Sequence, residues 1–307
     1  MPVKSVTVRV PAKVNLQLSV GPKEPDGYHN LVSVFQAISI FDDVTIKLSE
    51  PGAGLSISIS GDQTHGVPAD ANNLAAKAVA LISKEYDLTV DAHIEIKKSI
   101  PVAGGMAGGS ADAAATLVAC DAYWHAGIPR DQLDAMAATL GSDVPFMLHG
   151  GCALGIARGD VLSPVMTRGS FHWVLATYVD GLSTAEIYEK TDQMRGFEFD
   201  EMPEVPTELL SALARGDAPA LGRLLHNDLQ SAAIAARPTL GRVLEHGIDS
   251  GALGAVISGS GPTCAFLVRD ESSAIDLVVA LKASGLVDDV LRTHGPVHGA
   301  RVISTSR

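Results

Sequence analysis

Alternating apolar and polar residues predict that the first sixty residues form mostly β-strands. Val6, Val8 and Val10 are separated by polar residues, which is the two-residue period of a strand with one buried face. The segment 21–30 holds two prolines, two glycines and an Asp-Gly pair, so a loop is expected there. Further extended segments are expected at 14–20, 31–40, 43–48 and 55–59.

Helical patterns begin after this region and then mix with short strands. The first helix is predicted from about Asn73 to Tyr86, with Asn72 as its N-cap. Other helices are expected at 130–139, at 143–148, between 184 and 250, and at 271–284. Strands are expected at 93–97, 152–156, 172–178, 252–258, 264–268 and 297–303. Because this order is not a strict βαβ alternation, an α+β fold is favoured over a doubly wound parallel sheet.

The chain length favours two domains that share a cleft. The 307 residues are about twice the usual size of a domain. A segment rich in turn residues, 158–170, interrupts the pattern near the middle. We therefore predict an N-terminal domain of 1–165 and a C-terminal domain of 166–307.

Composition and charge exclude several classes of protein. Hydrophobic residues make up 46% of the chain and charged residues 19%, which excludes a disordered chain or a fibre. A net charge of −12 is unfavourable for binding a nucleic-acid backbone. The cysteines Cys120, Cys152 and Cys264 are odd in number, far apart and without a CxxC pair, so neither a disulfide framework nor a zinc site is expected. The sequence contains neither a signal-peptide pattern nor an apolar run of membrane length, and a cytoplasmic location is expected.

A glycine-rich loop is the first candidate for a functional site. Gly104, Gly105, Gly108 and Gly109 fall within six residues, directly before an alanine-rich helical segment. Glycines let the backbone approach a ligand, and a helix N-terminus offers N–H groups and a positive dipole end. The combination suits a di- or triphosphate.

Two common nucleotide motifs do not fit this loop. Gly104 and Gly109 have the spacing of a Walker loop, but Ser110 stands where the motif needs lysine. The dinucleotide pattern GxGxxG is not matched either. From composition alone, a merely flexible loop with close helix packing remains an alternative.

Three segments in order resemble the motifs of the GHMP kinase superfamily. The segment 11–31, PAKVNLQLSVGPKEPDGYHNL, resembles the first motif of this superfamily, and 101–114, PVAGGMAGGSADAA, resembles its phosphate loop. The segment 258–266, SGSGPTCAF, resembles its third motif. The DGYH of the first segment and LGSDVPF at 140–146 resemble one branch of the family in particular. In that branch the alcohol substrate is a methylerythritol with a cytidine diphosphate group, used in non-mevalonate isoprenoid synthesis.

The resemblance implies a two-domain kinase with its active site in the interdomain cleft, using ATP and Mg²⁺ to phosphorylate the 2-hydroxyl of that alcohol. It implies Lys13 and Asp143 as catalytic residues, with Asp143 accepting or orienting the hydroxyl proton. From local sequence alone, Asp143 also fits a helix cap, and Lys13 also fits a solvated strand residue.

The same resemblance implies residues for the two ligands. Asn15, Tyr28, His29 and Thr184 are expected on the acceptor side, with Tyr28 and His29 at the cytidine, although both could be ordinary loop residues. The nucleotide site is expected to comprise Asn73, Lys98 and the loop Pro101, Val102, Ala103, Gly104, Gly105, Met106, Ala107, Gly108, Gly109, Ser110 and Ala111.

Some alternatives stay open at this point. Asp112 could bind ribose, touch magnesium or complement the helix dipole. His294 and His298 have a spacing of four, but Gly295 and Pro296 break any helix between them, so a turn is favoured over a metal pair. Another small-molecule kinase of this family, such as a homoserine or mevalonate kinase, and a non-catalytic nucleotide-binding protein remain alternative functions. The protein is expected to be a monomer or a homodimer.

Overall fold

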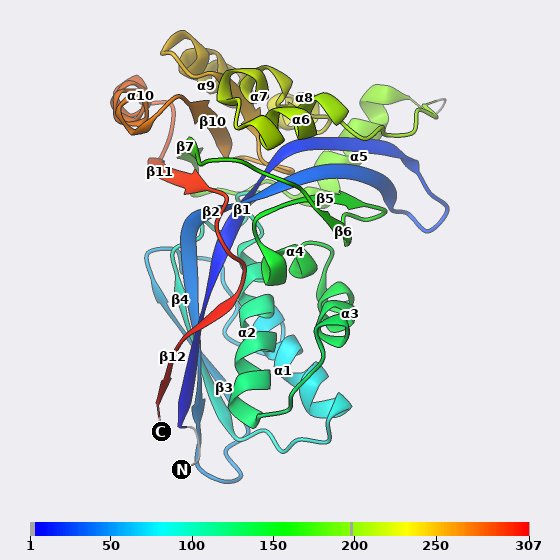
Figure 1. Ribbon diagram of the computed structural model, residues 1–307, viewed down its shortest axis with the longest axis vertical. Helices are drawn as coiled ribbons and strands as arrows, with labels where there is room; N and C mark the ends of the chain where they lie inside the picture. The colour runs from blue at the N-terminus through cyan, green and yellow to red at the C-terminus, as the bar shows by residue number, and fades with distance from the viewer. Residues whose placement is uncertain (1–3, 197–198, 307) are drawn as a thin grey trace.

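The computed structural model describes residues 4–196 and 199–306, and it confirms the α+β class (Figure 1). Within this part of the chain, eight strands form the larger sheet, ordered β12-β1-β2-β4-β3 with β5, β6 and β8 attached at its sides. Its strands are β1 (Ser5–Lys23), β2 (His29–Leu48), β3 (Leu55–Gly61), β4 (Ala92–Lys98), β5 (Cys152–Ile156), β6 (Val161–Pro164), β8 (His226–Asn227) and β12 (Arg301–Ser306).

The predicted N-terminal strands merge into two long ones. β1 continues through Pro11 and pairs antiparallel with β2 from Ser5 to Lys23. The pairing register shifts directly after Pro11. A strand can accept a proline at such an irregularity of the pairing. Side chains alternate between buried and half-buried at the start of β1, as the sequence predicts, but from Val10 to Leu16 all are buried. The middle of β1 is therefore covered on both faces.

The second sheet and the return of the chain to the first one differ in part from the prediction. The order of the second sheet is β11-β7-β10-β9. Its strands are β7 (Phe171–Thr177), β9 (Gly254–Ile257), β10 (Cys264–Val268) and β11 (Asp289–Gly295). The final strand expected near 297–303 exists but lies later, as β12 at Arg301–Ser306, and the sequence analysis did not predict β11, which ends at Gly295. β12 pairs with β1, so the end of the chain lies beside its beginning in the larger sheet (Figure 1).

The helices cover the two sheets separately. Figure 1 shows α1–α3 together on one side of the larger sheet and α6–α10 gathered around the smaller one. The helices are α1 (Leu74–Glu85), α2 (Gly108–Trp124), α3 (Arg130–Leu140), α4 (Val144–His149), α5 (Thr184–Arg195), α6 (Thr207–Arg215), α7 (Ala218–Leu224), α8 (Gln230–Ala236), α9 (Thr239–Asp249) and α10 (Glu271–Ser284). Among the described residues, no helix is long and apolar enough to cross a membrane.

The first helix and its cap each lie one residue later than predicted. Asn73, and not Asn72, is the N-cap of α1, because its Oδ1 accepts the backbone N–H of Ala75 at 2.8 Å. Asn72 instead donates its backbone N–H to Asp70 Oδ1 at 2.8 Å. Two adjacent asparagines are equivalent by capping preference, so only the turn before them decides which one caps the helix.

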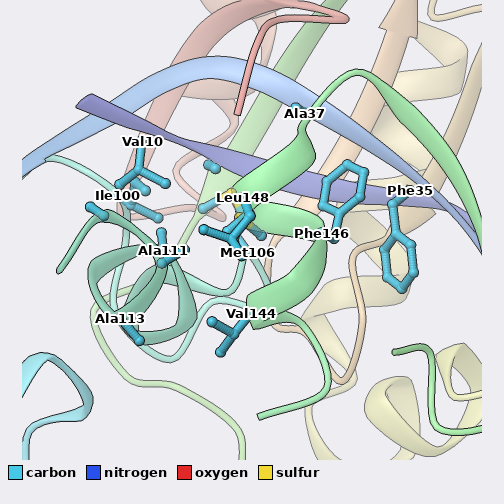
Figure 2. Close-up of a cluster of buried hydrophobic side chains, with 14 of the residues drawn as sticks. Val10, Phe35, Ala37, Ile100, Met106, Ala111, Ala113, Val144, Phe146 and Leu148 are labelled. Atoms are coloured by element: carbon cyan, nitrogen blue, oxygen red, sulfur yellow. The ribbon is translucent and has the colours of Figure 1, made fainter. Parts of the chain in front are cut away.

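The hydrophobic core beside the larger sheet extends directly under the candidate phosphate loop. Small side chains of α2, among them Ala111 and Ala113, are fully buried and let this helix approach the sheet. Figure 2 shows Met106 beside Leu148 of α4, with Val10 and Ile100 nearby. Because Met106 is fully buried, it anchors the loop from below.

Candidate active site

The backbone of the glycine loop is arranged to receive an anion. Ala103, Gly105 and Ala107 all have positive φ, at 52°, 75° and 59°, and left-handed residues of this kind are found in the concave nests where successive backbone N–H groups bind an anion. Within the described residues, no side chain caps the N-terminus of α2, which starts at Gly108. The first N–H groups of α2 are therefore free of helix partners and available to a phosphate.

The third glycine motif lies directly against this loop. Ser258 Oγ donates a hydrogen bond to the Gly105 carbonyl at 3.0 Å. A Cβ atom at Gly105 would overlap the Ser258 carbonyl oxygen, so only glycine permits this contact. On the other side of the turn, a Cβ atom at Gly259 would lie 3.5 Å from both Lys13 Nζ and Asn15 Oδ1. The turn thus joins the loop to the candidate catalytic lysine.

Two cavities meet at the glycine loop. The larger, of about 340 Å³, has Lys13, Asn15 and Asp143 in its wall together with Thr184 and Tyr188. The smaller, of about 240 Å³, has a mainly apolar wall that includes Val67, Pro68, Leu74 and Val102. Ala103, Gly108 and Gly109 line both. An extended ligand could therefore place one end in each cavity and cross the loop between them.

Lys13 and Asp143 face each other in the larger cavity. Lys13 Nζ lies 4.0 Å from Asp143 Oδ2. The lysine is 4% exposed, and burial lowers its pKa, although the charge of Asp143 acts in the opposite direction. Asp143 occupies the N-cap position of α4, yet its side chain makes no capping bond to any described residue. Its carboxylate is therefore free to interact with a ligand.

Asn15 fixes the lysine in place. Its Oδ1 accepts a hydrogen bond of 2.5 Å from Lys13 Nζ, and its Nδ2 donates to Ser33 Oγ at 2.8 Å. Ser33 in turn donates to the Gln17 carbonyl at 2.8 Å. Because alternate residues of a strand point to the same face, Lys13 and Asn15 project together from β1. Phe35 of β2 lies beside them, with its ring 5.7 Å from Lys13 Nζ.

Tyr28 and His29 do not line the cavity themselves, but each packs on a residue of its wall. The exposed Tyr28 ring stacks on the Arg158 guanidinium at 3.9 Å. His29 is buried, with its ring centroid 5.2 Å from that of Tyr188 and its Nε2 2.8 Å from Asp192 Oδ1. Arg158 and Tyr188 both line the cavity. The role predicted for Tyr28 and His29 stays a prediction, and the sequence analysis did not identify Arg158 and Tyr188, which lie in the cavity wall.

The remaining predicted residues fall into two groups. Thr184, the first residue of α5, lines the larger cavity and lies 2.9 Å from Ser260 of the third motif, hydroxyl to hydroxyl. Lys98 and Asn73 line the smaller cavity, but their polar atoms are already engaged. Asn73 caps α1 and donates to the Pro68 carbonyl, while the Lys98 ammonium is bonded to two buried carboxylates. Both side chains therefore shape the wall of the smaller cavity, and their polar atoms are not free to bind a phosphate.

Metal ligands are sparse in the described part of the chain, which holds no group of three or more His, Cys, Asp or Glu side chains suited to an ion. His294 lies 3.0 Å from Ser39 Oγ at the end of β11, as a strand-end residue. Magnesium is often held by nucleotide phosphates, water and only one or two protein oxygens. Ser110, which directly follows the glycines of the loop, carries such an oxygen and would hold the ion together with the phosphates.

Comparison with protein families places the whole chain among known kinases. The profile described as GHMP kinases N terminal domain matches residues 73–151, and GHMP kinases C terminal matches 209–286. A 4-diphosphocytidyl-2-C-methyl-D-erythritol kinase of Thermobifida fusca is 52% identical, covering 97% of this chain and 98% of that protein. The enzyme of the same name from Mycobacterium tuberculosis is 48% identical, over 99% of this chain and 95% of its own.

Solved structures agree in fold. A crystal structure of 4-(cytidine 5'-diphospho)-2C-methyl-D-erythritol kinase matches with a TM-score of 0.74 and 30% identity, covering 94% of this chain and 99% of that one. A homoserine kinase from Cytophaga hutchinsonii reaches a TM-score of 0.76 at 19% identity, covering 98% of each chain. At such low identity, the second likeness shows the fold alone.

Proposed function

This chain belongs to the GHMP kinase family, and within it to the 4-diphosphocytidyl-2-C-methyl-D-erythritol kinases, and we propose that it transfers the γ-phosphoryl group of ATP to the 2-hydroxyl of that alcohol. The observation that carries the chemistry is the free Asp143 carboxylate opposite Lys13, in a cavity that ends at the phosphate loop. A protein that only binds nucleotides has no need of this pair.

The nucleotide is proposed to span the two cavities. The smaller, mainly apolar cavity suits the adenine, and the triphosphate would pass over Gly108 and Gly109 toward Asp143. The N–H groups at the start of α2 would hold the phosphates. Magnesium fits beside Ser110, and when bound it would neutralise charge on the phosphoryl group during transfer.

Asp143 is proposed to orient the 2-hydroxyl and accept its proton. The Lys13 ammonium faces the Asp143 carboxylate at 4.0 Å, and Asn15 holds the lysine so that it can also face the acceptor oxygen. Phosphoryl transfer has a loose transition state, so positioning of the hydroxyl in line with the phosphorus is a large part of this contribution. Tyr188 stays protonated beside the pair, because burial raises the pKa of its phenol.

The cytidine end of the substrate is proposed to lie at Tyr188 and Arg158. Tyr188 offers an aromatic face for the base, and Arg158 is the second cation in the wall besides Lys13, suited to a diphosphate. His29 supports Tyr188 from behind. When His29 Nε2–H is donated to Asp192, the other ring nitrogen is left as an acceptor, and it is proposed to reach the exocyclic amine of a cytosine that lies on Tyr188.

A coupled assay of ADP release tests the proposed substrate. Turnover is expected with 4-diphosphocytidyl-2-C-methyl-D-erythritol at a kcat/KM at least 100-fold above that with homoserine or mevalonate, because neither alternative carries a base or a diphosphate. Comparable or better turnover of homoserine or mevalonate would reduce the assignment to an unspecified kinase of the family. Binding of ATP without turnover of any of the three alcohols would favour a non-catalytic protein.

His29→Ala is expected to weaken the choice of cytosine over uracil. Uracil presents a carbonyl where cytosine presents an amine, so losing the acceptor should raise KM for the cytidylyl substrate by about tenfold to a hundredfold. KM for a uridylyl analogue and for ATP should change little. Asp192→Asn should have a smaller effect of the same kind, since it removes the partner that sets the histidine tautomer. Unchanged discrimination in both variants would remove His29 from the recognition of the base.

A further inference from the structure

A short segment outside the three sequence motifs contacts the turn of the third glycine motif, residues 258–261. The segment begins with β8, which pairs in parallel with β1. Its second residue, Asn227, lies opposite Leu18 of β1 and is 5% exposed. The segment is therefore fixed to the same strand that carries Lys13, and its buried asparagine has no role in the reaction as described above.

The side-chain amide of Asn227 bonds to the backbone at the start of this turn. Its Nδ2 donates to the Ile257 carbonyl and to the Gly259 carbonyl, both at 2.7 Å. Its Oδ1 accepts the backbone N–H of Leu229 at 2.9 Å, which fixes the orientation of the amide. Both donor hydrogens are thus used. Ionised aspartate has the same shape but no hydrogen to donate, so the contact requires asparagine.

The Ile257 carbonyl lies on an open edge of the smaller sheet. β9 ends at Ile257 and pairs only with β10 in the described part of the chain. The next residue, Ser258, donates its backbone N–H across to the Thr263 carbonyl at 2.9 Å. Polar groups of successive residues point to opposite sides of a strand, so those of Ile257 point away from β10. Gln230 Oε1 accepts the Ile257 N–H at 3.0 Å, and Asn227 supplies the donor for its buried carbonyl.

The other side of the turn contacts groups of the active site. Ser258 Oγ donates to the Gly105 carbonyl of the phosphate loop at 3.0 Å. A Cβ atom at Gly259 would lie 3.3 Å from that same carbonyl oxygen and 3.5 Å from Lys13 Nζ. A shift of the Gly259 backbone would therefore change how the phosphate loop and the lysine lie relative to each other.

We propose that Asn227 is a positioning residue for phosphoryl transfer: by bonding to the turn of the third glycine motif, it keeps the phosphate loop aligned with Lys13. The inference rests on the proposed kinase function, because it gives the turn a part in that reaction. Asn227 lines neither of the two cavities at the phosphate loop, so it acts through the backbone of the turn and not on a substrate.

Asn227→Ala removes both bonds and leaves two buried carbonyls without this donor. We expect kcat/KM for ATP to fall by about 10- to 100-fold, because the phosphate loop and Lys13 are no longer held in one geometry. KM for the cytidylyl substrate should stay within about threefold, since its base and diphosphate are proposed to lie at Tyr188 and Arg158. Steady-state kinetics of the full chain, at a temperature well below the Tm of each variant, measure both constants.

Gln230→Ala is the matched control. It removes the other side-chain amide that bonds to Ile257 but leaves the Gly259 carbonyl with its donor. Its Tm should fall, while kcat/KM for ATP should stay within about twofold of the unchanged enzyme. If Asn227→Ala does not fold, Asn227→Ser takes its place. The serine hydroxyl can donate to one carbonyl, so the expected loss in kcat/KM for ATP is about threefold to tenfold.

Ser258→Ala tests whether Asn227 acts through the turn. It removes the hydroxyl that joins the turn to the phosphate loop. If both side chains act along this path, the double variant Asn227→Ala/Ser258→Ala should lose less kcat/KM for ATP than the product of the two single losses. A loss equal to the full product would mean that the two residues act independently, and it overturns the proposal.

The kinetic comparison also separates this proposal from the proposed kinase function. A loss in the Asn227 variant no larger than that in Gln230→Ala overturns the positioning role, while turnover by the unchanged protein still supports the kinase function. An unchanged protein inactive with all three alcohols contradicts the kinase function. The positioning role is then decided by the Kd for MgADP, which should rise by about tenfold in Asn227→Ala and stay unchanged in Gln230→Ala. Equal Kd values in these two variants overturn it.

Discussion

Asp143→Asn is expected to lower kcat by about 100- to 10,000-fold while the protein stays folded. The amide has almost the same shape as the carboxylate, but it cannot accept the proton of the substrate hydroxyl. Stability should be nearly unchanged, because the Asp143 side chain makes no capping bond with any described residue. The charge of Asp143 raises the pKa of Lys13, so removing that charge makes the lysine easier to deprotonate.

Two controls make this result specific to the reaction. Asp131→Asn makes the same chemical change at an exposed acid in the first turn of α3, and its kcat should stay within twofold of the unchanged enzyme. The Kd of Asp143→Asn for MgADP should stay within a few-fold as well, since the substitution leaves the phosphate loop intact. Activity of Asp143→Asn within threefold of the unchanged enzyme would contradict its role as the base.

Much of the fold follows from local pattern, and the errors arise where distant segments decide the structure. The alternation at Val6, Val8 and Val10 is enough to predict a strand and its buried face, which the structure confirms. The pairing of β12 with β1 joins residues at opposite ends of the chain, and no local pattern contains it. The domain boundary at 165 falls between β6 and β7, yet β12 of the second segment belongs to the larger sheet, so the division stays a prediction.

The candidate site shows the same limit. Four close glycines indicate a phosphate loop, but of these only Gly105 has positive φ, and the other two such positions are alanines. An alanine held in this conformation by its surroundings carries no sequence signal. Local sequence favoured Asp143 as a helix cap, and only its neighbours in space distinguish a ligand-facing carboxylate from a cap. The resemblance implies Lys98 for the nucleotide site, and no local pattern shows that its ammonium is bonded to two carboxylates, because these lie on other elements.

Gly105→Ala is expected to damage both stability and catalysis, because Gly105 is where the phosphate loop contacts the third glycine motif. The new Cβ would overlap the Ser258 carbonyl oxygen, and at a φ of 75° an L-residue is strained even without that contact. We expect the free energy of unfolding to fall by about 1–3 kcal/mol. The loop and the turn at Ser258–Gly261 must move apart, which displaces the phosphates from Lys13. A misplacement of this kind costs about 100-fold in kcat/KM for ATP.

Gly109→Ala is the matched control for the thermal unfolding measurement. Gly109 lies in the same loop, but its φ is not in the left-handed region, and an added Cβ would make an ordinary contact of 3.6 Å with Leu74. Its Tm should equal or exceed that of the unchanged protein, because alanine is the better helix former at the start of α2. Ser258→Ala combined with Gly105→Ala should not restore stability, since the overlap is with the backbone and not with the serine hydroxyl. If Gly105→Ala keeps the Tm and the kcat/KM of the unchanged enzyme, the contact between the two glycine motifs does not hold the phosphate loop in place.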